Sequence, residues 1–145
     1  MDRTVTPSRP FANPVHAILL AFPVALYPAA LLTDITYINT AEVQWTNFSS
    51  WLIAGADLFA GLVLGWAVLS RFFGGARHAG GRGTIYLIVV AAMFLLGVLN
   101  AFQHARDGWH SVGTMGLVLS ILCTLLALVA AVIAYGTANL VEKRA

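Results

Sequence analysis

Long apolar runs separated by short polar segments dominate the chain. Four of these runs are long enough for membrane crossing, because a helix needs about 20 apolar residues to span a hydrocarbon core of about 30 Å. They cover residues 15–38, 50–70, 84–103 and 112–135. The pattern predicts an all-α protein, an integral membrane four-helix bundle.

The polar segments between the runs are short, so consecutive helices are expected to pack antiparallel in an up-down-up-down order. We expect one transmembrane domain (15–135) between an N-terminal arm (1–14) and a tail (136–145). Pro14 suits the first turn of a helix, where its missing N–H costs nothing. Pro23 and Pro28 lie inside the first run and predict a bend there.

The basic residues indicate the orientation in the membrane. Seven lie on the side of the two termini and of the segment between the second and third runs: Arg3, Arg9, Arg71, Arg77, Arg82, Lys143 and Arg144. The opposite side has only Arg106. Cytoplasmic segments are enriched in lysine and arginine, so both termini are predicted to be cytoplasmic.

Composition excludes several classes of protein. Hydrophobic residues make up 59% and charged residues 10% of the chain, against about 45–50% and about 25% in soluble domains. The expected partner is therefore the lipid bilayer. Eight scattered basic residues give no footprint for nucleic acid, and the single Cys123 provides neither a disulfide nor a cysteine metal motif.

Polar side chains inside the runs are the candidate site. A carboxylate such as Asp57 costs about 2.5–3.5 kcal/mol in the membrane interior, so it should face the bundle. We expect a polar network in the outer half of the membrane, in which a buried hydrogen bond that fixes helix pairing is favoured over proton handling. Its predicted members are Asp34, Asp57, Asn100, His104 and Arg106.

Small residues at helical spacing indicate close helix packing. Gly61 and Gly65 follow Asp57 on one face of the second run. Gly113 and Gly116 begin a small-residue stripe on the fourth.

Histidines raise the question of haem b, which membrane four-helix bundles can hold between facing helices. The candidate ligands are His16, His104 and His110. His16 falls at the predicted cytoplasmic side and the other two at the outer side, about a bilayer apart. No cofactor and no metal are therefore expected, and haem b stays an alternative.

Two stretches carry a family resemblance: NPVHAILLAFPVALYPAALLTD (13–34) and LNAFQHARDGWHSVGTMGLVLS (99–120). They resemble an uncharacterised family of bacterial membrane proteins, domain of unknown function 2231. Asn13 and Ala21 stand where the family pattern has histidines, and the family's early third-helix histidine is absent. The resemblance implies the fold and topology of four helices in a bacterial inner membrane, and it does not supply an activity. The matching residues are His16, Phe22, Pro23, Ala25, Leu26 and Asp34.

The expected function is a non-catalytic one, a helix-packing or assembly subunit that contacts other membrane subunits or further copies of itself. The alternatives are a haem b redox subunit and a small proton or ion carrier that uses Asp57. An enzyme is not expected, because no nucleophile, base and orienting group fall together in the sequence.

Overall fold

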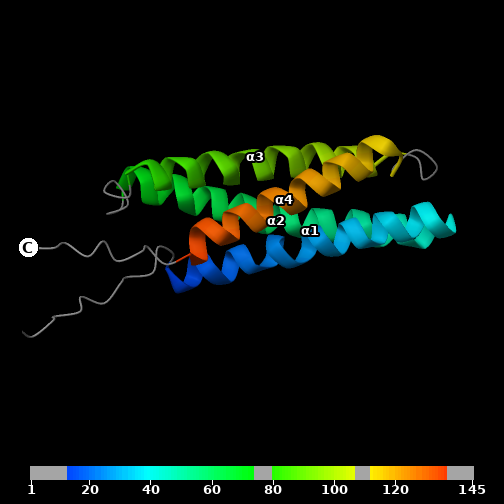
Figure 1. Cartoon of the computed structure of the whole chain (residues 1–145), viewed down its shortest axis with the longest axis horizontal. Coiled ribbons are helices and arrows are strands. Elements are labelled where there is room, and N and C mark those ends of the chain that lie inside the picture. The colour runs from blue at the N-terminus through cyan, green and yellow to red at the C-terminus, as the bar shows by residue number, and fades with distance from the viewer. Residues whose placement is uncertain (1–12, 74–79, 107–111, 137–145) are drawn as a thin grey trace, which may run out of the picture.

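The computed structural model describes residues 13–73, 80–106 and 112–136, and these form four helices (Figure 1). Each helix is long and apolar enough to span a membrane. The predicted all-α four-helix fold is confirmed. The helices are α1 (Pro14–Thr40), α2 (Val43–Phe73), α3 (Gly80–His104) and α4 (Thr114–Tyr135).

The helices form a ring in which each contacts its two neighbours in the order α1, α2, α3, α4 and back to α1. Consecutive helices run in opposite directions, and the start of α1 and the end of α4 lie at the same end of the bundle (Figure 1). In this arrangement α1 and α3 lie diagonally opposite each other and run parallel. Only side chains long enough to reach the bundle axis can connect them.

Local sequence explains how α1 begins and ends. The Asn13 side chain accepts a hydrogen bond from the Val15 N–H at 2.9 Å, and Pro14 occupies the first turn, as predicted. Ala41 adopts a left-handed conformation that ends the helix, and its N–H donates to the Tyr37 carbonyl at 2.8 Å.

The helix is continuous through its two interior prolines, Pro23 and Pro28. The bend expected at these residues stays a prediction.

The connection between the first two helices is shorter than the sequence predicts. Residues 39–49 were expected to form a polar loop, but only Ala41 and Glu42 separate α1 from α2. Hydropathy locates the part of a helix that lies in hydrocarbon, whereas the hydrogen-bonded helix can continue into the polar zone. Thr46 and Ser49 are buried between helices, which favours the longer α2.

Buried positions recur at alternating spacings of three and four residues, the pattern of a heptad seam. Each buried position of α1 has a counterpart in α3 exactly seventy residues later, and two hydrogen bonds join such counterparts. The matched residues are His16, Leu20, Pro23, Tyr27, Ala30 and Asp34 in α1, and Tyr86, Val90, Met93, Gly97, Asn100 and His104 in α3.

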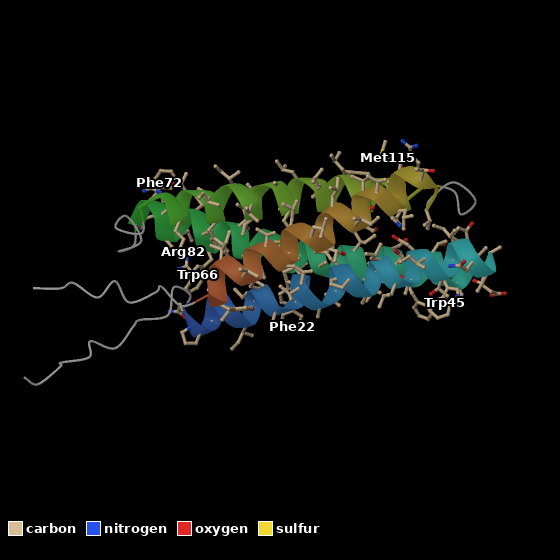
Figure 2. The ribbon with its side chains drawn as sticks, in the orientation of Figure 1. Phe22, Trp45, Trp66, Phe72, Arg82 and Met115 are labelled. Carbon is tan, nitrogen blue, oxygen red and sulfur yellow. The ribbon has the colours of Figure 1, made fainter. Side chains whose placement is uncertain are left out.

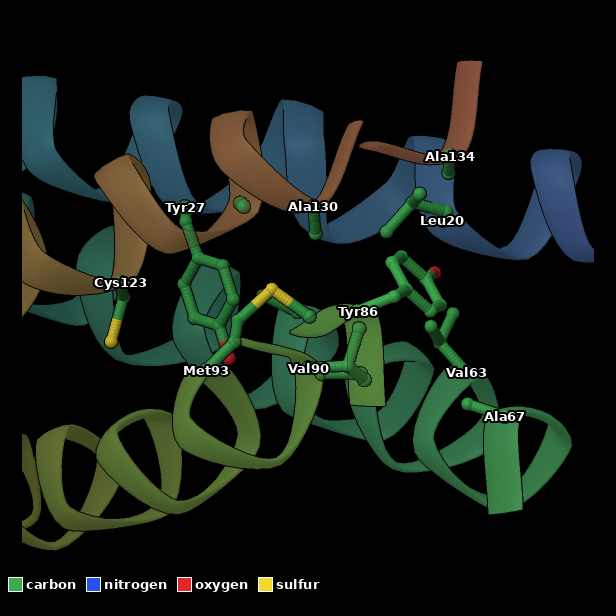
Figure 3. Packing of buried hydrophobic residues seen from close by; sticks show 13 residues of the cluster. Leu20, Tyr27, Val63, Ala67, Tyr86, Val90, Met93, Cys123, Ala130 and Ala134 are labelled. Atoms are coloured by element: carbon green, nitrogen blue, oxygen red, sulfur yellow. The ribbon is translucent and has the colours of Figure 1, made fainter. Parts of the chain in front are cut away.

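The centre of the bundle combines a few large side chains with many small ones. Tyr27, Tyr86 and Met93 project between the helices, while α4 contributes only small residues to the interior (Figure 3). Small residues allow α4 to approach its neighbours closely. The buried residues of α4 are Gly116, Ser120, Cys123, Thr124, Ala127, Ala130, Ala131 and Ala134.

The four glycines expected at packing contacts differ in their surroundings within the bundle. A Cβ on Gly61 would come within 3.1 Å of the Phe94 ring, and Gly116 is buried. A Cβ on Gly65 or Gly113 would meet nothing within 4 Å among the described residues, so a packing role for these two glycines stays a prediction. Helical spacing identifies a shared face, but it does not tell how near the neighbouring helix passes along that face.

Candidate functional site

Asp34 is the centre of a buried polar cluster that reaches all four helices. Its side chain is fully buried on α1. Ser49 of α2 donates a hydrogen bond to Oδ1, and Ser120 of α4 donates to Oδ2 at 2.5 Å. His104 of α3 places Nε2 3.0 Å from Oδ1. One carboxyl group thus connects three helices to the fourth.

His104 and Asn100 hold the α3 side of this cluster. They lie one turn apart on the buried face, and Nδ1 of His104 lies 3.0 Å from the Asn100 carbonyl oxygen. The Asn100 amide nitrogen donates to the Ser120 hydroxyl at 3.0 Å. The Oδ1 atom of Asn100 is buried and has no hydrogen-bond partner among the described residues.

A second polar pair lies deeper in the bundle. The Tyr27 hydroxyl of α1 donates to Oδ1 of Asp57 on α2 at 2.5 Å. Gly97 of α3 lies against both groups, because a Cβ at that position would overlap the Tyr27 hydroxyl and the carboxylate of Asp57. Tyr27 precedes Asp34 by seven residues, which corresponds to about 10 Å along the helix.

A third pair lies at the opposite end of the bundle. His16 Nε2 and the Tyr86 hydroxyl are 2.6 Å apart, and the His16 ring lies 6.3 Å from the Trp66 ring centre to centre. Figure 2 shows Trp66 and Arg82 at this end, and Trp45 and Met115 at the other. The Nδ1 atom of His16 is buried and has no partner among the described residues.

Apolar side chains separate the second and third pairs. Leu20, Val63 and Val90 are fully buried and belong to one apolar cluster with Tyr27 and Tyr86 (Figure 3). His16 precedes Tyr27 by eleven residues, or about 16 Å along α1. The second and third pairs are therefore separated by apolar side chains and do not form one cluster.

The structure brings together three of the five residues of the predicted network. Asp34, Asn100 and His104 share one cluster. Asp57 does not join them, because the register of α2 against α1 places its carboxylate beside Tyr27. Arg106 is exposed beyond the end of α3. Asp34 is paired with His104.

The candidate haem ligands do not converge. His16 and His104 belong to clusters at opposite ends of α1, and both ring nitrogens of His104 already face oxygen atoms. His110 lies outside the described residues. Residues 13–73, 80–106 and 112–136 also contain no group of three histidine, cysteine, aspartate or glutamate side chains arranged to hold a metal ion.

Four residues of these clusters were not predicted as part of a site: Tyr27, Ser49, Tyr86 and Ser120. Their hydroxyls are common in transmembrane helices and carry no charge to mark them. Heptad spacing links Tyr27 to Asp34, and Tyr86 lies on the same seam of alternating four- and three-residue spacings as His104; this pattern was the available signal.

Four apolar helices that enclose buried polar clusters define the class of this protein as a multi-pass integral membrane bundle. The chain belongs to a family of predicted membrane proteins, DUF2231, whose model matches residues 12–143. This confirms the resemblance seen in the two sequence stretches. No curated protein and no solved structure matches the chain.

Proposed function

We propose that this protein is a non-catalytic subunit of the bacterial inner membrane that acts through helix contacts in the assembly of a larger membrane complex. The observation that supports this role is the Asp34 cluster, in which one side chain from every helix takes part. The hydrogen bonds of the Asp34 carboxyl group hold the helices to one another.

The surface around this core suits contacts within the membrane. Large apolar side chains are exposed on all four helices, among them Trp51, Leu95 and Val132. The Phe22 and Phe59 rings stack at 3.8 Å on the α1 and α2 surface. A bundle with one fixed arrangement presents such a surface in a constant shape, which a partner subunit or another copy of the chain can recognise.

The proposed orientation places both termini in the cytoplasm. Arg71 in the last turn of α2 and Arg82 in the first turns of α3 lie at the end of the bundle where α1 begins and α4 ends. Basic residues of this kind favour the cytoplasmic side.

The test is the composition of the protein purified from membranes in mild detergent. We expect a defined complex, larger than the 15.5 kDa chain. The same stoichiometric subunit, or a second copy of the chain, should recur between preparations. Asp57→Asn should retain it, because the substitution preserves shape. Gly97→Leu should lose it, because a bulky side chain cannot fit beside Tyr27 and Asp57.

The same sample distinguishes the two alternatives. A haem absorption band that is lost on replacing His16 or His104 would favour the redox subunit. Proton or ion flux into liposomes that is abolished by Asp57→Asn would favour the carrier. A monodisperse single chain with neither property would contradict the assembly role.

A further inference from the structure

The hydrogen bonds around Asp34 and His104 fix the positions of most of their protons. A backbone carbonyl only accepts, so the contact of 3.0 Å between His104 Nδ1 and the Asn100 carbonyl requires a proton on Nδ1. The remaining ring nitrogen, Nε2, faces Asp34 Oδ1 at 3.0 Å.

The two serines do not supply a proton to this contact. Ser120 has one hydroxyl hydrogen, which it donates to Asp34 Oδ2, and it accepts from Asn100. Ser49 donates its own hydrogen to Oδ1. Both hydroxyls therefore support negative charge on the carboxyl group, and neither fills the space between Oδ1 and Nε2.

A proton between Nε2 and Oδ1 is therefore needed. Without it, two lone pairs would face each other at 3.0 Å, and a net negative charge would be buried in a membrane bundle. With it, the pair is neutral overall, whether the proton is bound to the imidazole or to the carboxyl. Both side chains are fully buried, so water cannot replace the contact.

We propose that Asp34 and His104 form a binding site for a single proton, held between Oδ1 and Nε2 in the outer half of the bundle. The proton moves between these two atoms without any other bond being broken. Since α1 and α3 are diagonal in the ring, the bound proton is part of the contact that joins them.

The surroundings leave this pair to act by itself. The groups that contact Asp34 from α2 and α4 are the hydroxyls of Ser49 and Ser120, which do not titrate near neutral pH. The next carboxyl group, Asp57, is bonded to Tyr27 deeper in the bundle. The nearest described cation along α3, Arg106, is exposed. The site needs no partner subunit and is independent of the assembly role.

The test counts protons on the two groups in the full-length protein in detergent, at a pH of about 8, where exposed aspartate and histidine side chains are both deprotonated. Nitrogen NMR of histidine-labelled protein counts the ring N–H groups of His104, assigned by their loss in His104→Gln. Infrared difference spectra against Asp34→Asn detect a protonated carboxyl group. We expect two protons in total: either two ring N–H groups, or one together with a protonated Asp34.

Asp34→Asn is also the matched variant, because an amide N–H can take the place of the shared proton. In it, His104 should carry one ring N–H only. If His104→Gln does not fold, the triple variant His16→Gln, His78→Gln, His110→Gln leaves His104 as the single histidine to be observed.

Two results would overturn the proposal. One is a single ring N–H together with an ionised Asp34 in the wild-type protein. The other is a second ring N–H that persists unchanged in Asp34→Asn, since the proton would then not be held by the pair.

Discussion

At the scale of single residues, the core can pack closely around Tyr27 and Asp57 only because position 97 is a glycine. A Cβ there would overlap the Tyr27 hydroxyl and the Asp57 carboxylate, and would lie 3.1 Å from the Asp57 Cγ. These groups are already hydrogen bonded to each other, so neither can move away without losing its partner. Gly97 is thus required by the pair that it faces.

Gly97→Ala is expected to destabilise the protein by about 1–3 kcal/mol, the usual cost of overpacking a core. The measurement is thermal unfolding in detergent. Gly65→Ala is the matched control, since it also replaces a glycine inside a helix but meets nothing within 4 Å. It should be neutral or slightly stabilising, because alanine is the better helix former. Equal destabilisation by both would contradict this account.

Tyr27→Phe is expected to cost about 1–3 kcal/mol, because it leaves the buried carboxyl of Asp57 without its donor. Combining it with Asp57→Leu should restore part of the loss, since both polar partners are then removed. A double-mutant cycle measures this coupling. Additive effects of the two substitutions would show that the hydrogen bond contributes nothing to stability.

The polar members of the site were predictable where a single helix, or similar depth in the membrane, determines their position. Asn100 and His104 are one turn apart on the same helix, so their shared face follows from the sequence. The place of Asp57 depends on how far α2 is shifted along α1, and no local pattern encodes that shift. Hydropathy also treats Tyr27 only as an apolar residue, so it did not identify Tyr27 as a member of the site.

At the scale of helices, Arg82 connects the first turns of α3 to the end of α4. Its guanidinium donates to the carbonyl oxygens of Ile133 and Gly136, each at 2.6 Å. The last carbonyls of a helix lack partners within it, so these bonds satisfy them and place a cation near the negative end of the helix dipole.

Arg82→Gln should loosen the end of α4. We expect faster amide hydrogen exchange in the last turn of this helix, around Val132 and Gly136, with little change near Ser120. Arg106→Gln, which alters an exposed arginine at the other end, is the control. Unchanged exchange at the end of α4 would mean that the two bonds do not hold it.

The four helices could be predicted from hydropathy, because a membrane requires about 20 apolar residues in each. The ends of the helices were harder to predict from the sequence. The start of α1 follows from Asn13 and Pro14, which have the chemistry of a helix start. The start of α2 at Val43 does not, since polar residues such as Thr46 and Ser49 look like a loop until α1 is seen to cover them.

At the scale of the whole molecule, the ring of antiparallel helices places Glu42 at the end opposite the start of α1. With cytoplasmic termini, this residue faces the outside of the cell. Glu42→Cys should react with a membrane-impermeant maleimide added to intact cells. The native Cys123 is buried and should not be labelled. Ser70→Cys, near the other end of α2, should react only in inverted vesicles. The reverse pattern would overturn the orientation.

The matched spacing of α1 and α3 has a mechanical consequence. Tyr27 fits only where Gly97 leaves room, and sliding α3 by one heptad would set the tyrosine against Val90 or His104 instead. The same slide would separate His16 from Tyr86 and Asp34 from His104. Piston-like motion of one helix along the other is therefore blocked at three levels at once.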